Sequence, residues 1–199
     1  MTAEYAFHHP VVRTVAYEAQ LKSSWGELHR RLASAIERRE PDLADENAAL
    51  IAEHLAAAGD LHAAYKWHMR AGVWSTHRDI KAAKTNWQRA QEIADRLDAD
   101  DADRLAMRIA PRTLLCANAW RVAGTVEDAG FDELRELTGV AGDKLSLIIG
   151  MAGLLAALTF NDRIVEAAEL ATECTSLIAV ARPLIVPWHF AMRYEPSRV

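Results

Sequence analysis

The feature that most constrains this chain is a pattern of small and large residues that occurs twice between residues 57 and 97. Its two copies are Ala64, His68 and Ala71 and, 19 positions further on, Ala83, Trp87 and Ala90. Residues at such spacings share one face of an α-helix, where small side chains let a neighbouring helix approach and a large one fills the groove. A single helix pair cannot bury such a face alone, so the pattern predicts stacked antiparallel helix pairs.

Length and charge narrow the class of protein. The 199 residues suffice for one domain or for about four to five helix pairs. Hydrophobic residues make up 51% of the chain and charged residues 26%, which is a globular composition. The 23 Lys and Arg residues are scattered among 28 Asp and Glu, for a net charge of −5. The chain as a whole therefore offers no basic surface for nucleic acid.

Cysteine content and hydropathy indicate the cellular compartment in which the protein is expected. Cys116 and Cys174 are too few for a disulfide framework, and the first ten residues contain neither a basic nor an apolar signal region. The most apolar run, residues 145–160, is shorter than the roughly 20 residues that cross a bilayer, and it is expected to form a buried helix. We expect a cytoplasmic protein that does not contact a membrane.

Apolar periodicity predicts a succession of helices with almost no strand beyond residues 5–7. The expected helices span about 10–21, 23–39, 45–59, 60–76, 79–97, 104–122, 131–140, 144–160 and 164–180. Pro111 is expected to interrupt the helix at 104–122. Ser24, with Glu27 three residues later, fits a capping box, and Asp45 is the expected N-cap of the next helix.

Two sets of residues resemble known families. Ala48, Ile51, Ala52 and Leu55, followed by Gly59, Ala64, His68 and Ala71, resemble a tetratricopeptide repeat. Tyr5, Phe7, His9, Pro10, Arg13 and Tyr17, followed by L-H-R-R-L-A at 28–33, resemble the junction after the signalling-ATPase module of large actinobacterial, especially mycobacterial, regulators. In those proteins a winged-helix segment is followed by a tetratricopeptide-like array, and a class III adenylate cyclase or a LuxR-type domain is attached.

The resemblance covers residues 5 to 178 and implies an all-α fold, a tetratricopeptide-like right-handed helical-repeat solenoid of antiparallel helix pairs. It also implies the regulatory end of such a protein, without its catalytic parts. The expected organisation is a winged-helix-like remnant with linking helices at 1–40, the helical array at 41–181 and an irregular Pro-rich tail at 182–199. Because the pattern stops before a polar capping helix, we expect a truncated or frame-shifted chain with an apolar end face that favours self-association.

Four patterns that suggest chemistry have simpler explanations. Asp143 precedes Lys144 in a glycine-containing stretch and would repel phosphate, so it is expected to be an N-cap instead. The acidic run at 98–103 lacks the glycine and the closing glutamate of a calcium loop. The central histidines, His54, His62, His68 and His77, lack zinc-site spacing. Cys116 and Cys174 are expected to be packing thiols. We therefore expect no catalytic residue, no cofactor and no metal.

The function expected is a non-catalytic interaction or regulatory module that binds a protein or peptide segment. The candidate partner-binding residues are Tyr65, Trp67, His68, Arg70, Trp74 and Trp87. One alternative is a nucleic-acid-linked regulator that uses residues 5–39, with the basic cluster Arg30, Arg31, Arg38 and Arg39; the acidic balance makes nucleic acid the less favoured partner. An enzyme acting through the His-rich centre is the third alternative.

Overall fold

The computed structural model describes residues 22–39, 41–122 and 129–191, and within these ranges the chain is built from helices and turns, without a strand. The helices are α2 (Lys22–Arg39), α3 (Ala48–Ala57), α4 (Leu61–Ser75), α5 (Ile80–Arg96), α6 (Arg104–Ala117), α7 (Phe131–Ala141), α8 (Lys144–Phe160) and α9 (Ile164–Ala191), with short 3-10 helices η1 (Pro41–Leu43) and η2 (Ala119–Arg121). The expected all-α class is confirmed. The strand expected at 5–7 and the helix expected at 10–21 lie outside the described residues.

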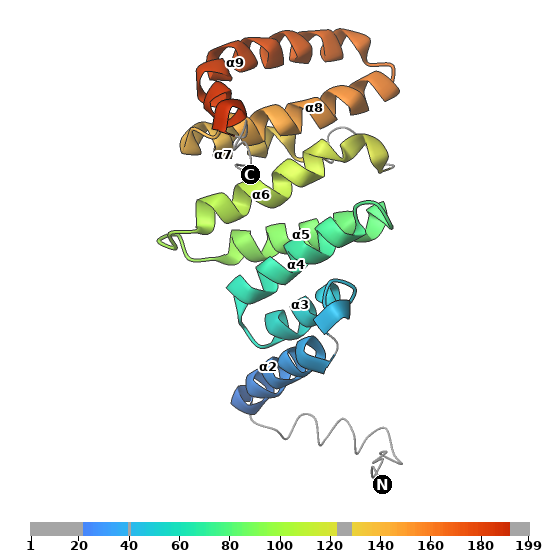
Figure 1. Cartoon of the computed structure of the whole chain (residues 1–199), viewed down its shortest axis with the longest axis vertical. Helices are drawn as coiled ribbons and strands as arrows, with labels where there is room; N and C mark the ends of the chain where they lie inside the picture. The colour runs from blue at the N-terminus through green and yellow to red at the C-terminus, as the bar shows by residue number, and fades with distance from the viewer. Residues whose placement is uncertain (1–21, 40, 123–128, 192–199) are drawn as a thin grey trace, which may run out of the picture.

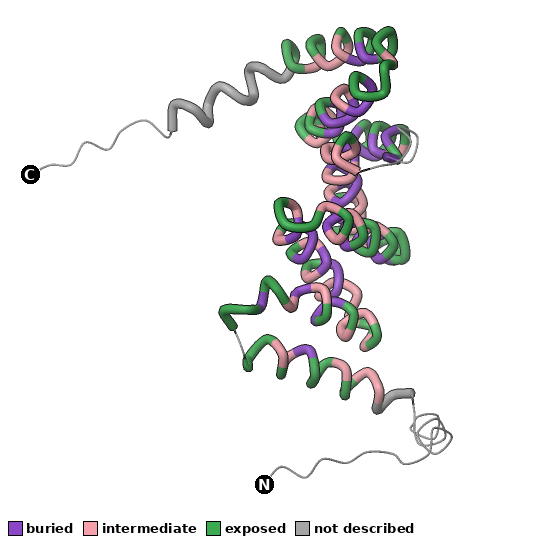
Figure 2. Tube along the Cα trace, turned by 90° about the vertical axis from the view of Figure 1, so that its right-hand side faces the viewer, coloured by how far each residue is buried: buried purple, intermediate pink, exposed green. Residues whose placement is uncertain are grey.

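The helices are stacked along the long axis of the molecule (Figure 1). From α2 to α6 each helix packs on the next one in the chain, α8 packs on both α6 and α9, and α7 lies against α6 and α8. Each of these helices has exposed as well as buried residues where its burial is described (Figure 2). The chain is therefore an elongated stack, and its core runs through the contacts between successive helices.

The residues of the repeated pattern lie in the contact between α4 and α5, as predicted. Ala64, Ala83 and Ala90 are completely buried, and Trp87 is 1% exposed. A Cβ added to Gly72 on α4 would lie 2.2 Å from Nε1 of Trp87, so only glycine leaves room for the indole ring at this point. The two helices thus approach closely enough for a tryptophan of one to pack against the backbone of the other.

Three helical hairpins close with the same turn geometry. Gly59 after α3 and Gly142 after α7 adopt left-handed backbone angles, with φ of 78° and 68°, and Asp162 after α8 does so with φ of 57°. In the turn after α3 the Asp60 amide donates to the Leu55 carbonyl. This is the hydrogen bond from the sixth residue to the first that defines a Schellman motif. The equivalent bonds run from residue 143 to 138 and from residue 163 to 158. The helix boundary expected between residues 59 and 60 is confirmed.

A second core lies between α6, α7 and α8. Its fully buried side chains include Cys116, Leu134 and Met151. A Cβ on Gly153 of α8 would lie 2.3 Å from the Cα atom of Ala117, so α8 crosses the end of α6 backbone against backbone. Helix α6 borders both cores, because Met107 packs with the α4 and α5 residues.

The apolar run at 145–160 forms a helix that is buried on one face only, which corrects the expectation of a buried helix. Leu145 and Phe160 at the two ends of α8 are 60% and 70% exposed. No helix within the described ranges is both long and apolar enough to cross a membrane.

Two of the three predicted N-caps are wrong. Ser24 lies inside α2, which has begun by Lys22, and Glu27 instead accepts hydrogen bonds from Arg30 and Arg31. Asp45 lies in the turn before α3, whose N-terminal boundary is Asn47. Asp143 accepts a hydrogen bond from a backbone amide at the start of α8, as predicted, and Asp60 does the same at the start of α4. At the first two positions a tertiary pairing or an earlier helix start overrides the local capping preference.

Proline is less disruptive than the sequence suggested. Pro111 lies inside α6, which continues without a break to Ala117, so the predicted interruption is wrong. Helix α6 also ends before the predicted residue 122, and η2 follows it. Helix α9 continues to Ala191 through the segment predicted as an irregular tail from residue 182. A proline removes one helical hydrogen bond but does not by itself end a helix whose other bonds remain.

Candidate functional site

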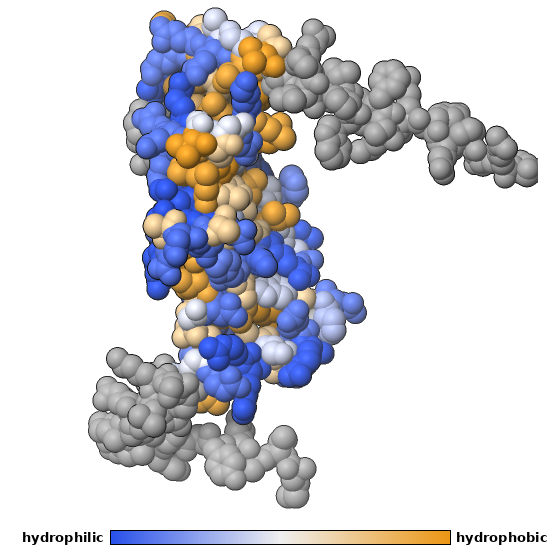
Figure 3. Space-filling model, turned by 90° about the vertical axis from the view of Figure 1, so that its left-hand side faces the viewer, coloured by the Kyte–Doolittle hydropathy of each residue, from blue (hydrophilic) through white to orange (hydrophobic). Residues whose placement is uncertain are grey.

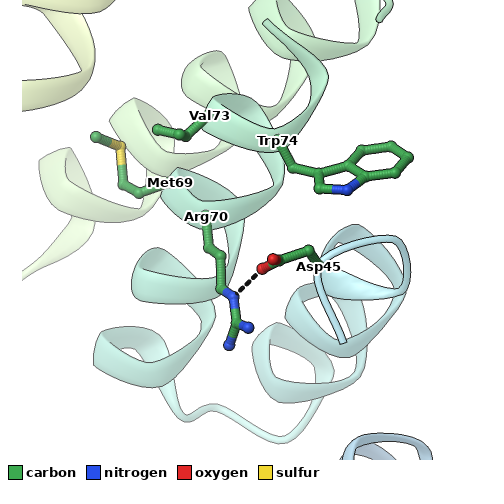
Figure 4. A pocket seen from close by; sticks show the side chains of 5 residues that line it. All are labelled: Asp45, Met69, Arg70, Val73 and Trp74. Atoms are coloured by element: carbon green, nitrogen blue, oxygen red, sulfur yellow. Dashed lines mark hydrogen bonds and ion pairs between the residues drawn. The ribbon is translucent and has the colours of Figure 1, made fainter. Parts of the chain in front are cut away.

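The candidate site is a pocket of about 320 Å³ on the outer face of α4, lined by Asp45, Met69, Arg70, Val73 and Trp74 (Figure 4). Met69 and Arg70 lie one helical turn before Val73 and Trp74 on α4. All four side chains therefore face the same side of the helix. Asp45 comes from the turn that precedes α3. We call this the α4 pocket.

An ion pair closes one side of the α4 pocket. Nε of Arg70 donates to Oδ1 of Asp45, and both side chains are about half exposed. The Arg70 guanidinium also lies over the ring of Trp67, with its Cζ atom 4.6 Å from the ring centroid. The ion pair and the ring together hold Arg70 in one orientation and leave the pocket wall without net charge.

The other side of the pocket is apolar and open. Val73 is 61% exposed, and it lies between Met69 and Trp74 in the close-up view (Figure 4). The guanidinium of Arg78 lies over the Trp74 ring at 4.5 Å and donates a hydrogen bond from Nη1 to the Trp74 carbonyl. A guanidinium stacked on a ring keeps its N–H groups in its own plane, where they can donate to a carboxylate. Arg78 is therefore a fixed cation stacked on the ring of Trp74, which lines the pocket.

Only part of the predicted partner-binding set is accessible, which corrects that prediction. Tyr65, His68 and Trp87 are 8%, 2% and 1% exposed and belong to the interior between helices. Burial raises the pKa of Tyr65 to about 12. Arg70 and Trp74 line the α4 pocket, and Trp67 supports it from beneath Arg70. The sequence placed all six residues near one another but could not separate the two faces of α4.

His68 is a packed core residue, as its place in the repeat suggested. It donates through Nδ1 to Oδ1 of Asn86 at 2.9 Å, since that oxygen can only accept. Asn86 in turn donates to the Ala82 carbonyl. Burial lowers the pKa of His68 although the hydrogen bond to Asn86 opposes the shift. The side chain is a neutral bridge between α4 and α5.

The two cysteines occupy different environments. Cys116 is completely buried, its Sγ donates to the Ala129 carbonyl at 3.2 Å, and burial raises the pKa of its thiol to about 12. Such a thiol is almost never a thiolate near neutral pH, so it serves packing. Cys174 is partly buried at the edge of the same core.

A group of ion pairs that the sequence analysis missed joins α5, α6 and α7. Arg112 is 2% exposed and donates from Nη2 to Asp95 at 2.7 Å and to Glu133 at 2.9 Å. Arg108 donates to the same two carboxylates at 2.8 Å each. Burial alone would raise the pKa of Asp95, but the hydrogen bonds from the two arginines hold it below its usual value. The network pins the two cores together across α6.

The basic cluster near the start of the chain makes contacts within α2, and Arg30 also donates to the Ala58 carbonyl at the end of α3. Glu27 pairs with Arg30 at 3.2 Å and with Arg31 at 2.9 Å, and Arg38 donates to the Ser34 carbonyl. Exposed contacts of this kind are typical of a solvated helix side. The Gly139–Lys144 stretch covers the last residues of α7, the connection at Gly142 and Asp143, and the first residue of α8; Asp143 caps α8 by accepting a hydrogen bond from the Ser146 amide.

Hydrophobic surface is distributed unevenly along the stack. On the face shown in Figure 3, hydrophobic residues are more frequent in the upper part of the stack than in the lower part. The exposed residues of α9 include Ile164, Val165 and Val180, at 56%, 74% and 61%. The expected apolar end and the self-association that follows from it stay predictions.

No family model, no curated protein and no solved structure matches the chain significantly.

Proposed function

We propose that the chain is a non-catalytic helical-repeat interaction module that binds an acidic peptide segment of a partner protein in the α4 pocket. The proposal includes a tetratricopeptide-like, right-handed arrangement of the helix pairs. The shared turn geometry after α3, α7 and α8 supports a repeated unit, and so does the glycine and alanine contact between α4 and α5. Stacked helix pairs leave one face of alternate helices exposed, and such faces serve peptide recognition.

The observation that carries the proposal is the rigid, amphipathic surface around Val73. An apolar side chain of a partner would cover Val73 and the edge of the Trp74 ring, which burial of apolar area favours. The cations on either side are already held in place by Trp67 and Trp74, so binding orders little further. Tryptophan and arginine are also the residue types that dominate interface energetics.

The charge of α4 indicates the chemistry of the partner. Helix α4 contains Lys66 and Arg70 and no Asp or Glu, and Arg78 follows it, although the whole chain has a net charge of −5. Because Arg70 is neutralised by Asp45, Arg78 is the cation best placed for a partner carboxylate. We therefore expect an aliphatic or aromatic side chain next to an Asp or Glu in the bound peptide.

A peptide-library selection tests this function. The full chain is immobilised, peptides are selected from a random displayed library, and their affinity is measured by fluorescence anisotropy. We expect enrichment of peptides that combine an apolar and an acidic residue. Val73→Glu should weaken them roughly tenfold or more, because it places a charge in the apolar part of the pocket. The matched control is Val165→Glu, at a similarly exposed valine of α9. Equal binding to native protein and Val73→Glu would exclude the pocket as the site.

On the resemblance at residues 5–33, we also propose that the module is the regulatory part of a signalling ATPase coupled to an adenylate cyclase or a transcription regulator. The support is the sequence motif alone. Translating the reading frames on both sides of the gene tests it, since an ATPase, cyclase or LuxR-type sequence in a neighbouring frame is expected. Flanking frames that encode none of these would contradict this part of the proposal and leave peptide binding untouched.

A further inference from the structure

A second site lies at the opposite end of α4 from Trp74, where three metal-ligating side chains meet. His62 is in the first turn of α4, and Asp101 and Asp103 lie in the connection between α5 and α6. One ligand atom from each residue falls within 4.8 Å of the other two. These residues are close only in the folded chain, because His62 is far from the two aspartates in sequence.

The separation of the donors suits a single metal ion. Nε2 of His62 lies 3.1 Å from Oδ2 of Asp101. Two donors bound at about 2.1 Å to one ion are about 3.0 Å apart in octahedral geometry and about 3.4 Å apart in tetrahedral geometry. The observed distance lies between these values. A carboxylate oxygen of Asp103 lies within 4.8 Å of both other donors, and this carboxylate makes no capping hydrogen bond to α6.

The backbone around these donors is already ordered. Oδ1 of Asp101 accepts the Asp103 amide at 2.9 Å, which orients the carboxylate and leaves Oδ2 directed at His62. Asp98 and Asp100 lie in the same connection and add negative charge without a basic residue between them. An oriented carboxylate in a negative field is a better metal ligand than a free one.

We propose that His62, Asp101 and Asp103 bind a first-row divalent transition ion, such as Zn²⁺, with water in the remaining positions. One imidazole nitrogen and two carboxylate oxygens favour such an ion over Ca²⁺ or Mg²⁺, which take oxygen ligands. The bound ion would connect the start of α4 to the start of α6 and so stabilise the packing of the α4–α5 pair against α6. This departs from the expectation that the chain binds no metal, which considered the acidic run and the histidines separately.

The test uses the full chain, stripped with a chelator, dialysed and titrated with ZnCl2. Binding is followed by calorimetry and by competition with a chromophoric chelator, and the visible absorption of a Co²⁺-substituted sample reports the ligand field. We expect one zinc equivalent whose affinity falls roughly tenfold or more in His62→Ala and in Asp101→Asn. Zinc should raise the melting temperature of the native chain and not of these variants.

Two matched controls separate this site from other histidines. His77→Ala removes an exposed histidine just beyond the other end of α4 and should leave zinc affinity unchanged. His54→Ala removes one member of the His29–His54 pair, whose Nδ1 atoms are 3.0 Å apart and which offers another pair of metal-ligating nitrogens. Circular dichroism checks that each variant folds. We expect His62→Ala to fold, because the His62 side chain is 42% exposed and contributes little to the core. Zinc binding that survives His62→Ala, or that is lost with His54→Ala alone, overturns the proposal, and so does the absence of binding at micromolar zinc.

Discussion

Helices α4 and α5 and helices α6 and α8 are both held close by a glycine, but the two glycines face different kinds of atoms. Gly72 faces the indole ring of Trp87, whereas Gly153 faces the Cα atom of Ala117 and the Cys116 carbonyl oxygen. A side chain can be exchanged for a smaller one, while backbone atoms move only if the whole helix moves. A clash introduced at Gly72 can therefore be relieved by a second substitution at Trp87. A clash introduced at Gly153 cannot be relieved by changing a side chain.

The largest effect is expected where the two regions join. Arg112→Ala removes a buried cation and leaves Asp95 and Glu133 with one arginine between them. We expect a loss of about 3–5 kcal/mol in the free energy of unfolding, measured by urea denaturation. The transition should also separate into two steps, seen as different midpoints for tryptophan fluorescence and circular dichroism. Arg89→Ala, at an exposed ion pair, is the control and should change stability by less than about 1 kcal/mol. A single transition with near-native stability in Arg112→Ala would show that the network does not couple the regions.

Gly153→Ala tests the backbone contact. The added methyl group would overlap the end of α6, and we expect a loss of about 3 kcal/mol in unfolding free energy. Adding Ala117→Gly should not restore stability, because the clash is with the Cα atom and not with the Ala117 methyl group. Recovery of stability in the double variant would contradict the distinction between the two contacts.

Gly72→Ala tests the side-chain contact. We expect a loss of about 2 kcal/mol, because Trp87 is fully buried and its ring has no free space to enter. In the background of Trp87→Leu, which is itself destabilising by about 3 kcal/mol, the same glycine substitution should be close to neutral. A double-mutant cycle measures this coupling, and strictly additive losses would refute it.

The smallest effect concerns pH and is confined to the region of α2 to α5. Burial lowers the pKa of both His54 and His68 in the folded chain, and the neighbouring His29 lowers that of His54 further. Below about pH 6.5 the unfolded chain therefore binds protons that the folded chain does not, so stability falls as the pH is lowered through this value. Amide exchange at pH 5 and pH 7 should show faster opening in α3–α5 at the lower pH, with α7–α8 unaffected after correction for intrinsic rates. His68→Gln should reduce the difference, and an unchanged pH dependence in that variant would assign the effect elsewhere.

Local patterns predicted much of the fold because they reflect single helices and their ends. The buried face of α4 and the Gly59 turn follow from spacing and from the backbone freedom of glycine, both of which act within a few residues. Pro111 shows the limit of this reasoning, since packing on both sides of α6 outweighs one missing hydrogen bond. Asp45 shows the same limit of local patterns. Its ion-pair partner, Arg70, is close to it only in the folded chain.

The candidate sites depend on such distant pairings and were harder to predict. Arg70 and Trp74 were singled out for their residue types, but Val73, the most exposed apolar part of the α4 pocket, carried no sequence signal. The arginine network did have a sequence signal. Arg104, Arg108 and Arg112 are spaced four residues apart, which places three cations on one side of α6. Their acidic partners lie on neighbouring helices, where spacing along the chain gives no guidance.

The common turn after α3, α7 and α8 has a consequence for how this chain can change length. Because each of these three hairpins ends with a left-handed residue and the same closing hydrogen bond, the exit direction of the following helix is set in the same way at all three turns. Duplication or loss of a whole hairpin would therefore preserve the geometry of the remaining stack, while an insertion inside a helix would rotate every buried face beyond it. Variation among descendants of such a gene should come in hairpin-sized steps.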